Sequence, residues 1–134
     1  MTTFPYEAET AGIIVRVRPT YLADESKPSE NKFVWAYQVE IENARDEAWQ
    51  VVSRHWQIVD AHGRVQNVEG EGVVGQTPTL EPGGVFRYTS GAPLSAPSGM
   101  MGGRYDLLGP SGEALTATIP TFSLDSPFDR SRPS

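Results

Sequence analysis

The chain has 134 residues, a formal net charge of −6 at pH 7 and no cysteine, and each of these properties excludes something. A chain of this length forms one domain around a single core. Without cysteine it can have no disulfide framework, no thiolate zinc site and no cysteine nucleophile. Nucleic-acid binding depends on clustered Lys and Arg, whereas the 11 basic residues are scattered along an acidic chain, so we expect no nucleic-acid partner.

Export and membrane insertion are not expected either. The first residues, Met-Thr-Thr-Phe-Pro-Tyr, lack the basic and apolar regions of a secretory signal, and no run approaches the roughly 18 apolar residues of a membrane-spanning helix. We therefore predict a cytoplasmic protein. The 13 Gly and 11 Pro residues favour a fold with many turns over one with long helices.

Alternating side chains predict the first two strands. The first covers residues 12–18, because every second side chain is apolar, namely Ile13, Val15 and Val17. Residues 23–32 are polar and aperiodic, and we expect an exposed, mobile loop there. The clearest strand covers residues 33–41, and the side chains expected in the core are Phe33, Trp35, Tyr37, Val39 and Ile41.

The central part of the chain predicts a hairpin. Residues 49–59 form a long strand, and the side chains expected on one face are Val52, Arg54, Trp56 and Ile58. Residues 60–63, Asp-Ala-His-Gly, form a turn, because Asp initiates turns and Gly accepts positive φ. Residues 64–68 are then expected to return antiparallel.

Three more strands follow. A tight turn at residues 81–84 opens a strand in which Phe86 and Tyr88 share one side. The next strand is marked by Met101, Tyr105 and Leu107, and after a turn at residues 109–112 the last one is marked by Leu115, Ala117 and Ile119.

About seven short strands without helical periodicity predict an all-β fold, an antiparallel β-sandwich of immunoglobulin or fibronectin type III style. A small barrel is the alternative. We expect a single domain over residues 1–134, with its core in residues 12–125 and a flexible tail at residues 126–134.

One glycine-rich segment has the form of a cofactor motif. Residues 70–75 read Gly-Glu-Gly-Val-Val-Gly, a formal GxGxxG. A dinucleotide fingerprint requires a helix that begins at the last glycine, and Pro78 and Pro82 exclude that helix. We interpret the segment as a bent or bulged strand, with a small anion site made of backbone amides as the alternative. Arg16 and Arg18 are interpreted as solvent-facing, although they could also meet one small anion.

The two histidines give weak metal candidates. His55 lies within a predicted strand and His62 in a hairpin turn with Asp60 nearby, and imidazole and carboxylate are ordinary ligands of divalent metals. Their spacing matches no known site. No serine lies in a GxSxG elbow. We predict no enzyme activity and no cofactor.

Motifs in the second half of the chain resemble those of the ApaG family. They are Arg54-His55-Trp56-x-Ile58-x-Asp60, Val68-x-Gly70-x-Gly72-Val73-Val74-Gly75, Pro78-x-Leu80-x-Pro82-Gly83, Tyr88-x-Ser90-Gly91, Gly99-x-Met101-x-Gly103-x-Tyr105 and Ile119-Pro120-x-Phe122-x-Leu124. The similarity extends to Ala36-Tyr37-x-Val39-x-Ile41-x-Asn43, so it covers nearly the whole chain. Two residues depart from the family pattern, Ala96 where Thr is expected and Leu107 where Met is common.

The resemblance implies a fibronectin type III-like sandwich and a bacterial protein without a catalytic site. Proteins similar to this one are linked by name to cobalt and magnesium efflux or resistance, and are associated with the enzyme that hydrolyses diadenosine tetraphosphate. In eukaryotic F-box and DNA-polymerase-interacting proteins the same domain looks like a partner-binding module.

We therefore expect a non-catalytic binding domain, a monomer or homodimer, whose ligand is a protein partner or a small phosphorylated molecule. The candidate ligand-binding residues lie within the motifs above and are Arg54, His55, Gly70, Glu71, Gly72, Gly75, Tyr88 and Ser90. Two alternatives stay open. One is a soluble factor in divalent-metal homeostasis, and the other is a phosphohydrolase, for which the needed cluster of metal-binding carboxylates and histidines is missing.

Overall fold

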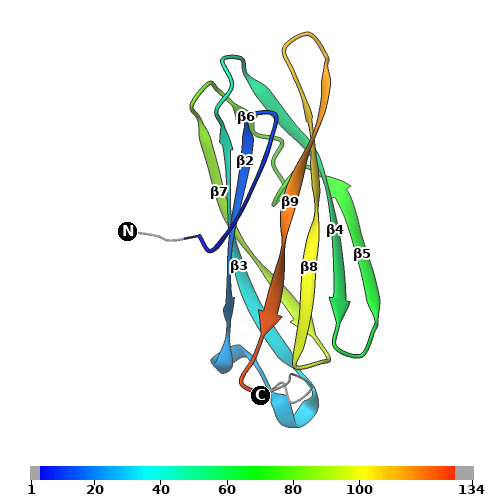
Figure 1. Cartoon of the computed structure of the whole chain (residues 1–134). Helices are drawn as coiled ribbons and strands as arrows, with labels where there is room; N and C mark the ends of the chain where they lie inside the picture. The colour runs from blue at the N-terminus through cyan, green and yellow to red at the C-terminus, as the bar shows by residue number, and fades with distance from the viewer. Residues whose placement is uncertain (1–3, 129–134) are drawn as a thin grey trace.

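The computed structural model describes residues 4–128, which form nine strands and two single-turn 3-10 helices (Figure 1). The strands are β1 (Tyr6–Thr10), β2 (Ile13–Tyr21), β3 (Phe33–Asn43), β4 (Trp49–Asp60), β5 (Val65–Glu71), β6 (Thr79–Leu80), β7 (Val85–Leu94), β8 (Ser98–Leu108) and β9 (Ala114–Asp125). The 3-10 helices are η1 (Ala23–Glu25) and η2 (Pro28–Glu30).

The strands form two antiparallel sheets that pack face to face. One sheet has the order β1-β2-β3-β7, and the other has the order β5-β4-β8-β9, with β6 also paired to β4. Figure 1 shows the two layers side by side along their length. The predicted all-β antiparallel sandwich is therefore confirmed.

The core lies between the sheets and follows the alternation of the sequence. Every second residue of β3 points inward, and the predicted core residues of β2 and β3 are all buried. The opposite sheet contributes further large apolar side chains, which include Trp49, Trp56, Tyr105, Leu107, Ile119, Phe122 and Leu124. Side chains of alternating parity thus fill one continuous interior, as expected for packed sheets.

On one side of the sandwich the two sheets meet. There β1 and β2 both pack against β9. The Tyr6 hydroxyl lies 3.2 Å from Ser123 Oγ, and the backbone N–H of Thr118 donates to Thr10 Oγ1 over 3.1 Å. The rings of Tyr6 and Phe122 are 5.8 Å apart. We call this side the closed seam.

On the other side the sheets end in β7 and β5, which belong to different sheets and each have one unpaired edge. The strand β5 packs chiefly on its neighbour β4, and the part of the chain that the structure describes shows no comparable packing of β5 on β7. We call this side the open seam. Any cavity between the sheets is therefore expected here.

One predicted parity is wrong. Val52 was expected to share the inward face with Arg54, but the fully buried residue is Val51. The reason is a β-bulge between Val51 and Ser53, where the pairing with β8 shifts by one residue. The inward pattern resumes at Arg54 and Trp56.

Three local features were not predicted. The short strands β1 and β6 were missed, so nine strands replace about seven. The segment expected to be a loop contains η1 and η2, with the Ser26 hydroxyl donating to Leu22 O and accepting the N–H of Val34. Within the expected tail, Ser126 Oγ donates to Pro97 O over 2.6 Å, and the remainder, residues 129–134, lies outside the described residues.

No helix within residues 4–128 has the length and apolar character needed to cross a membrane.

Candidate functional site

The open seam contains a cavity of about 240 Å³ between the two sheets. Its walls come from five strands and are largely apolar. The inward residues that line it include Tyr37, Arg54, Trp56, Val68, Ser90 and Met101. Arg54 contributes the one charged group of this lining.

Arg54 is held in place by the end of β5. Its Nη1 donates to the carbonyl oxygens of Glu71 and Gly72, over 2.9 and 3.0 Å. The guanidinium lies directly over Gly70, where an added Cβ would come within 3.0 Å of Nη1. Gly70 is thus the residue that leaves room for the guanidinium. Among the described residues, no carboxylate forms an ion pair with Arg54.

A pair of tyrosines lies beside this guanidinium. The hydroxyls of Tyr88 and Tyr105 hydrogen-bond to each other. Burial raises the pKa of both phenols well above the ordinary value, and the positive charge of Arg54 only partly opposes this effect. Both hydroxyls are therefore neutral at physiological pH, and Arg54 has no phenolate to neutralise it.

A second cavity of about 480 Å³ adjoins the first toward the β4–β5 hairpin. The two share Ile58, Gln66 and Pro93 as lining residues. At its far end Arg64 Nη1 donates to Ser95 Oγ over 3.0 Å. Together the two cavities form one elongated groove along the open seam, and we refer to them as the seam groove.

The glycine-rich segment borders the upper end of this groove. After β5 the chain makes a tight turn in which Val73 and Gln76 exchange two backbone hydrogen bonds, of 2.7 and 2.9 Å. The two central residues, Val74 and Gly75, both have positive φ, as in a type I′ turn. No helix begins at Gly75, as predicted, but the segment is not one bent or bulged strand, because β5 ends at Glu71 in regular register and a tight turn follows.

Three backbone amides in and beside this segment already donate hydrogen bonds within the protein. The N–H groups of Gly72, Val73 and Gln76 donate to backbone carbonyls within the protein. The carbonyl oxygens of Glu71 and Gly72 accept hydrogen bonds from the positively charged Arg54 side chain. The segment therefore positions Arg54 through its carbonyl groups.

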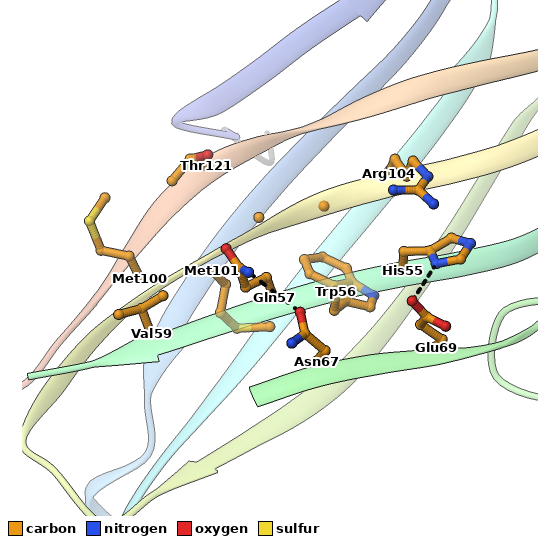
Figure 2. A pocket seen from close by; sticks show the side chains of 12 residues that line it. His55, Trp56, Gln57, Val59, Asn67, Glu69, Met100, Met101, Arg104 and Thr121 are labelled. Atoms are coloured by element: carbon orange, nitrogen blue, oxygen red, sulfur yellow. Dashed lines mark hydrogen bonds and ion pairs between the residues drawn. The ribbon is translucent and has the colours of Figure 1, made fainter. Parts of the chain in front are cut away.

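His55 points to the opposite face of the same sheet, because neighbours on a strand alternate. It borders a shallow groove of about 350 Å³ that lies over Gly102 and Gly103 (Figure 2). His55 Nε2 lies 2.9 Å from Asp106 Oδ2, and Nδ1 lies 3.2 Å from Glu69 Oε1. The imidazole is thus placed between two carboxylates.

The polar group around Asp106 is not a catalytic triad. Ser53 Oγ donates to Asp106 Oδ2 over 2.8 Å and not to His55, whereas a triad needs a base bonded to the nucleophile. Burial opposes ionisation of Asp106, but hydrogen bonds from Ser53, His55 and Thr116 outweigh it and lower the pKa of this carboxyl. The arrangement stabilises a carboxylate.

The metal candidates do not converge. His62 sits at the hairpin tip, where its backbone N–H donates to Asp60 Oδ1 over 2.9 Å. His55 lies five residues before Asp60 on the same strand, about 17 Å away at ordinary strand rise. Within residues 4–128 no group of three or more His, Cys, Asp or Glu side chains could hold a metal ion.

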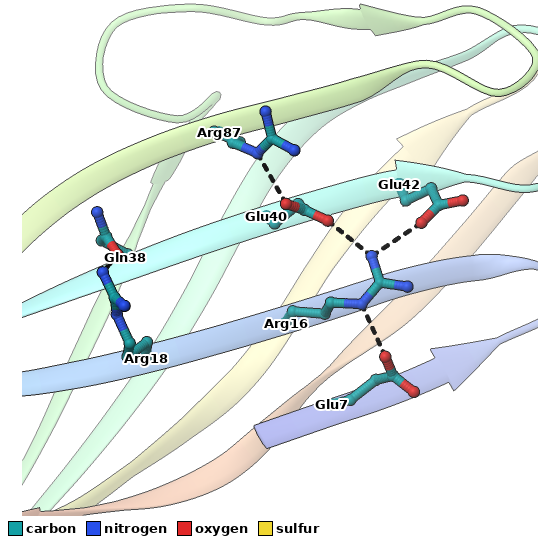
Figure 3. Close-up of polar contacts among 7 residues, drawn as sticks. All are labelled: Glu7, Arg16, Arg18, Gln38, Glu40, Glu42 and Arg87. Carbon is teal, nitrogen blue, oxygen red and sulfur yellow. Dashed lines mark hydrogen bonds and ion pairs between the residues drawn. The ribbon is translucent and has the colours of Figure 1, made fainter. Parts of the chain in front are cut away.

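Arg16 and Arg18 lie on the outer face of the four-stranded sheet (Figure 3). Arg16 forms ion pairs with Glu7, Glu40 and Glu42 at 2.7–2.8 Å, and these carboxylates raise its pKa further. Arg18 donates to Gln38. The charge of Arg16 is therefore neutralised within the protein, which makes it a poor anion site.

The predicted site residues fall into two groups. Six of them lie together at the upper end of the seam groove, namely Arg54, Gly70, Glu71, Gly72, Tyr88 and Ser90. Gly75 supports the turn beyond them, and His55 lies on the other face. Two groove residues were not predicted as site residues: Tyr37 was expected in the core and Trp56 on one strand face with Arg54, because their apolar character gives no sign that they border an opening.

The fold and the groove define a small antiparallel β-sandwich domain with one closed and one open edge. The chain belongs to the ApaG family, since the model of the ApaG domain matches residues 23–109. A Protein ApaG from Maricaulis maris is 54% identical over 125 residues, which cover 93% of this chain and 96% of that protein. A Protein ApaG from Rhodospirillum centenum is 57% identical over 128 residues, covering 96% and 98%.

A solved structure agrees with this assignment. The crystal structure of a Bordetella pertussis protein that carries the name ApaA is 43% identical and covers 96% of this chain and 100% of its own, with a TM-score of 0.84. The resemblance to the ApaG family seen in the sequence is confirmed.

Proposed function

We propose that this ApaG-family domain is a non-catalytic binding domain and that the seam groove holds its ligand. One observation carries the proposal: Arg54 lies without an acidic partner in a cavity that opens between two unpaired strand edges. Arg54 is only partly buried, and both of its hydrogen bonds use Nη1, so the rest of the guanidinium can bind a ligand from the opening. Cavities of this kind, apolar with a few placed polar groups, are typical of binding sites.

The dimensions of the groove favour a segment of a partner protein. Its two cavities, of about 240 and 480 Å³, share lining residues from β4, β5 and β7, so the groove follows these strands along the open seam. A single extended chain suits this shape better than a dinucleotide.

A small phosphorylated ligand is the second candidate. The observation in its favour is again Arg54, whose planar guanidinium binds phosphate as readily as carboxylate. The amides of Gly72, Val73 and Gln76 already donate to backbone carbonyls, which counts against a phosphate-binding loop in the glycine-rich segment itself. Such a ligand would therefore contact Arg54 rather than the turn.

The proposal also includes an indirect role in cation handling or nucleotide metabolism and a cytoplasmic location. A role in divalent-cation handling, or beside diadenosine tetraphosphate hydrolysis, would act through a bound partner, because the histidine and carboxylate candidates lie apart. A cytoplasmic location is part of the same proposal, and the absence of cysteine agrees with a reducing compartment.

Site-specific photo-crosslinking in bacterial cells tests the proposal. Gln66 and Asn67 are neighbours on β5, but Gln66 lines the seam groove and Asn67 lines the groove over Gly102 and Gly103. We expect a crosslinker at position 66 to give discrete protein adducts that weaken on Arg54→Gln, and one at position 67 to give none. Adducts at position 67 alone, or nucleotide turnover by the purified protein, would refute the proposal.

A further inference from the structure

We propose that the occupant of the seam groove is an extended, acidic segment of a partner protein that adds a strand to β5. A carboxylate side chain of the partner segment binds Arg54, and the partner residues two and four positions from that acidic residue are apolar. This inference rests on the proposed function and adds the chemistry of the partner. It follows from the positive charge of Arg54, the spacing of the groove-lining residues and the strand edges at the open seam.

Charge is the first argument. The chain has a formal net charge of −6, and on the outer face of the other sheet Arg16 is surrounded by three glutamates. Arg54 instead bonds only to two neutral carbonyls, both through Nη1. Those bonds fix the guanidinium while its Nε and Nη2 remain for a ligand. A fixed, planar guanidinium is well suited to accept a carboxylate in a bidentate pair.

The apolar spacing is the second argument. Arg54, Trp56 and Ile58 all face inward along β4, two residues apart, which is about 6.8 Å per step. Tyr37 and Met101 complete the wall near Trp56, and Leu94 lines the wider cavity near Ile58. A chain running beside these strands presents every second side chain inward at the same spacing. The matching pattern is an acidic residue, then apolar residues at the second and fourth positions from it.

The strand edges are the third argument, and they favour β5 over β7 as the strand to which the partner segment is added. Both β5 and β7 have one unpaired edge that borders the groove. Pro93 in β7 has no N–H to donate. The edge of β5 contains no proline over its seven residues, and only its last carbonyl, Glu71 O, already bonds to Arg54, so it can pair with an added strand over most of its length, as in other strand-addition complexes.

The test uses designed peptides and the full chain. Two acetylated probes contain Glu-Thr-Val-Thr-Leu and the reverse order, because an added strand can run either way, and two matched probes replace Glu by Gln. Binding is measured by calorimetry and by backbone amide shifts. We expect one Glu probe to shift the amides of residues 65–71 and the Gln probe of the same order to bind about tenfold more weakly, the loss expected for one charged hydrogen-bonded pair.

Variants of the protein identify the arginine. Arg54→Gln should weaken the Glu probe about tenfold and leave the Gln probe nearly unchanged, so the two changes are not additive. Arg54→Lys should restore part of the difference. Arg104→Gln is the matched control, because it removes one positive charge from the opposite face of the same sheet. Thermal unfolding of each variant shows whether the fold is retained.

Each other outcome overturns the inference. Equal binding of Glu and Gln probes, or equal loss with Arg104→Gln, would show that the acidic group is not recognised. Pyrophosphate that shifts the signals around Arg54 when neither peptide does would assign the groove to a small anion. Reversible self-association that disappears in Arg54→Gln would assign it to a second copy of the chain. In these cases crosslinking at position 66 still decides the proposed function separately.

Discussion

The two seams of the sandwich are built from the same kind of strands but end differently. At the closed seam, β1 and β2 cover β9, and Thr10, Ser123 and the ring pair of Tyr6 and Phe122 join the sheets. At the open seam, β5 and β7 leave a groove that exposes Arg54 and part of the core. The short strand β1 thus helps to cover one edge of the core, whereas the described residues provide no such strand beside β5 and β7.

The largest expected effect comes from breaking the closed seam. Phe122 is fully buried and its ring lies near those of Tyr6, Tyr37 and Trp56. We expect Phe122→Ala to lower the free energy of unfolding by about 3–5 kcal/mol, because it leaves a cavity in the core. Urea denaturation measures this. Phe128→Ala is the control, since that ring is nearly half exposed, and an equal loss in both variants would contradict a special contribution from the buried Phe122 ring.

The next effect concerns the turn above the open seam. Gly72 has φ of +63°, and an added Cβ would lie 2.1 Å from Gln76 O. Gly72→Ala should therefore lower the free energy of unfolding by about 1–3 kcal/mol. Gly75→Ala is the matched control, because Gly75 also has positive φ but nothing within 4 Å of its Cβ position. Equal stability of the two variants in urea would contradict this description of the turn.

A smaller effect on stability is expected from the charged network on the outer face of the four-stranded sheet, which connects β1 at the closed seam with β7 at the open seam. In Figure 3 this network runs from Glu7 on β1 through Arg16 and Glu40 to Arg87 on β7. Burial opposes ionisation of Glu40, but hydrogen bonds from Arg87 and Arg16 outweigh it and lower its pKa. We expect Glu40→Gln to lower the free energy of unfolding by about 1 kcal/mol at pH 7.

The pH dependence of Glu40 has a definite sign. A carboxyl whose pKa is lowered by folding stabilises the protein above its unfolded-state pKa, and this contribution is lost as the pH falls through the folded-state value. Urea titrations from pH 7 down to pH 3 should show the difference between wild type and Glu40→Gln shrinking with acid. A constant difference would mean that the ionised form of Glu40 does not matter.

The smallest effect is a gain in stability at the tip of the open-seam turn. Val74 is exposed and has φ of +44°, a conformation that β-branched residues rarely adopt and Asn adopts more easily. Val74→Asn should raise the free energy of unfolding by about 0.5–1 kcal/mol. Val85→Asn, an exposed valine in a strand, is the control. A loss at position 74 in thermal unfolding would indicate that the valine makes a contact worth more than its strain.

Much of the fold could be predicted because alternation along one strand is a local property. The inward residues of β2 and β3 follow directly from it. The strand β1 was missed because its side chains are at most partly buried, so its sequence shows only weak alternation of apolar residues. The parity of Val51 and Val52 could not be predicted, since the bulge between Val51 and Ser53 depends on the pairing with β8.

The candidate site was accessible to sequence reasoning only in part. Arg54, Gly70 and Gly72 were singled out through the family motifs, and the structure explains their grouping, because Gly70 gives Arg54 space and Gly72 accepts its hydrogen bond. That Tyr37 and Trp56 line a groove depends on which strand edges lie beside each other. This is a property of the assembled sheets and leaves no mark in the local sequence.

The edges of the open seam also bear on how the protein behaves at high concentration. Exposed strand edges can template fibril growth by stacking copies of the same chain. Here the edge of β7 is interrupted by Pro93, and β5 ends in Glu69, Gly70 and Glu71, so an identical strand would bring like charges close together. The acidic partner segment proposed above has its carboxylate on the inward face with Arg54, whereas Glu69 lies on the opposite face beside His55, so this repulsion is smaller for the partner. Pro93 and the two glutamates are therefore features that disfavour stacking of identical chains at these edges.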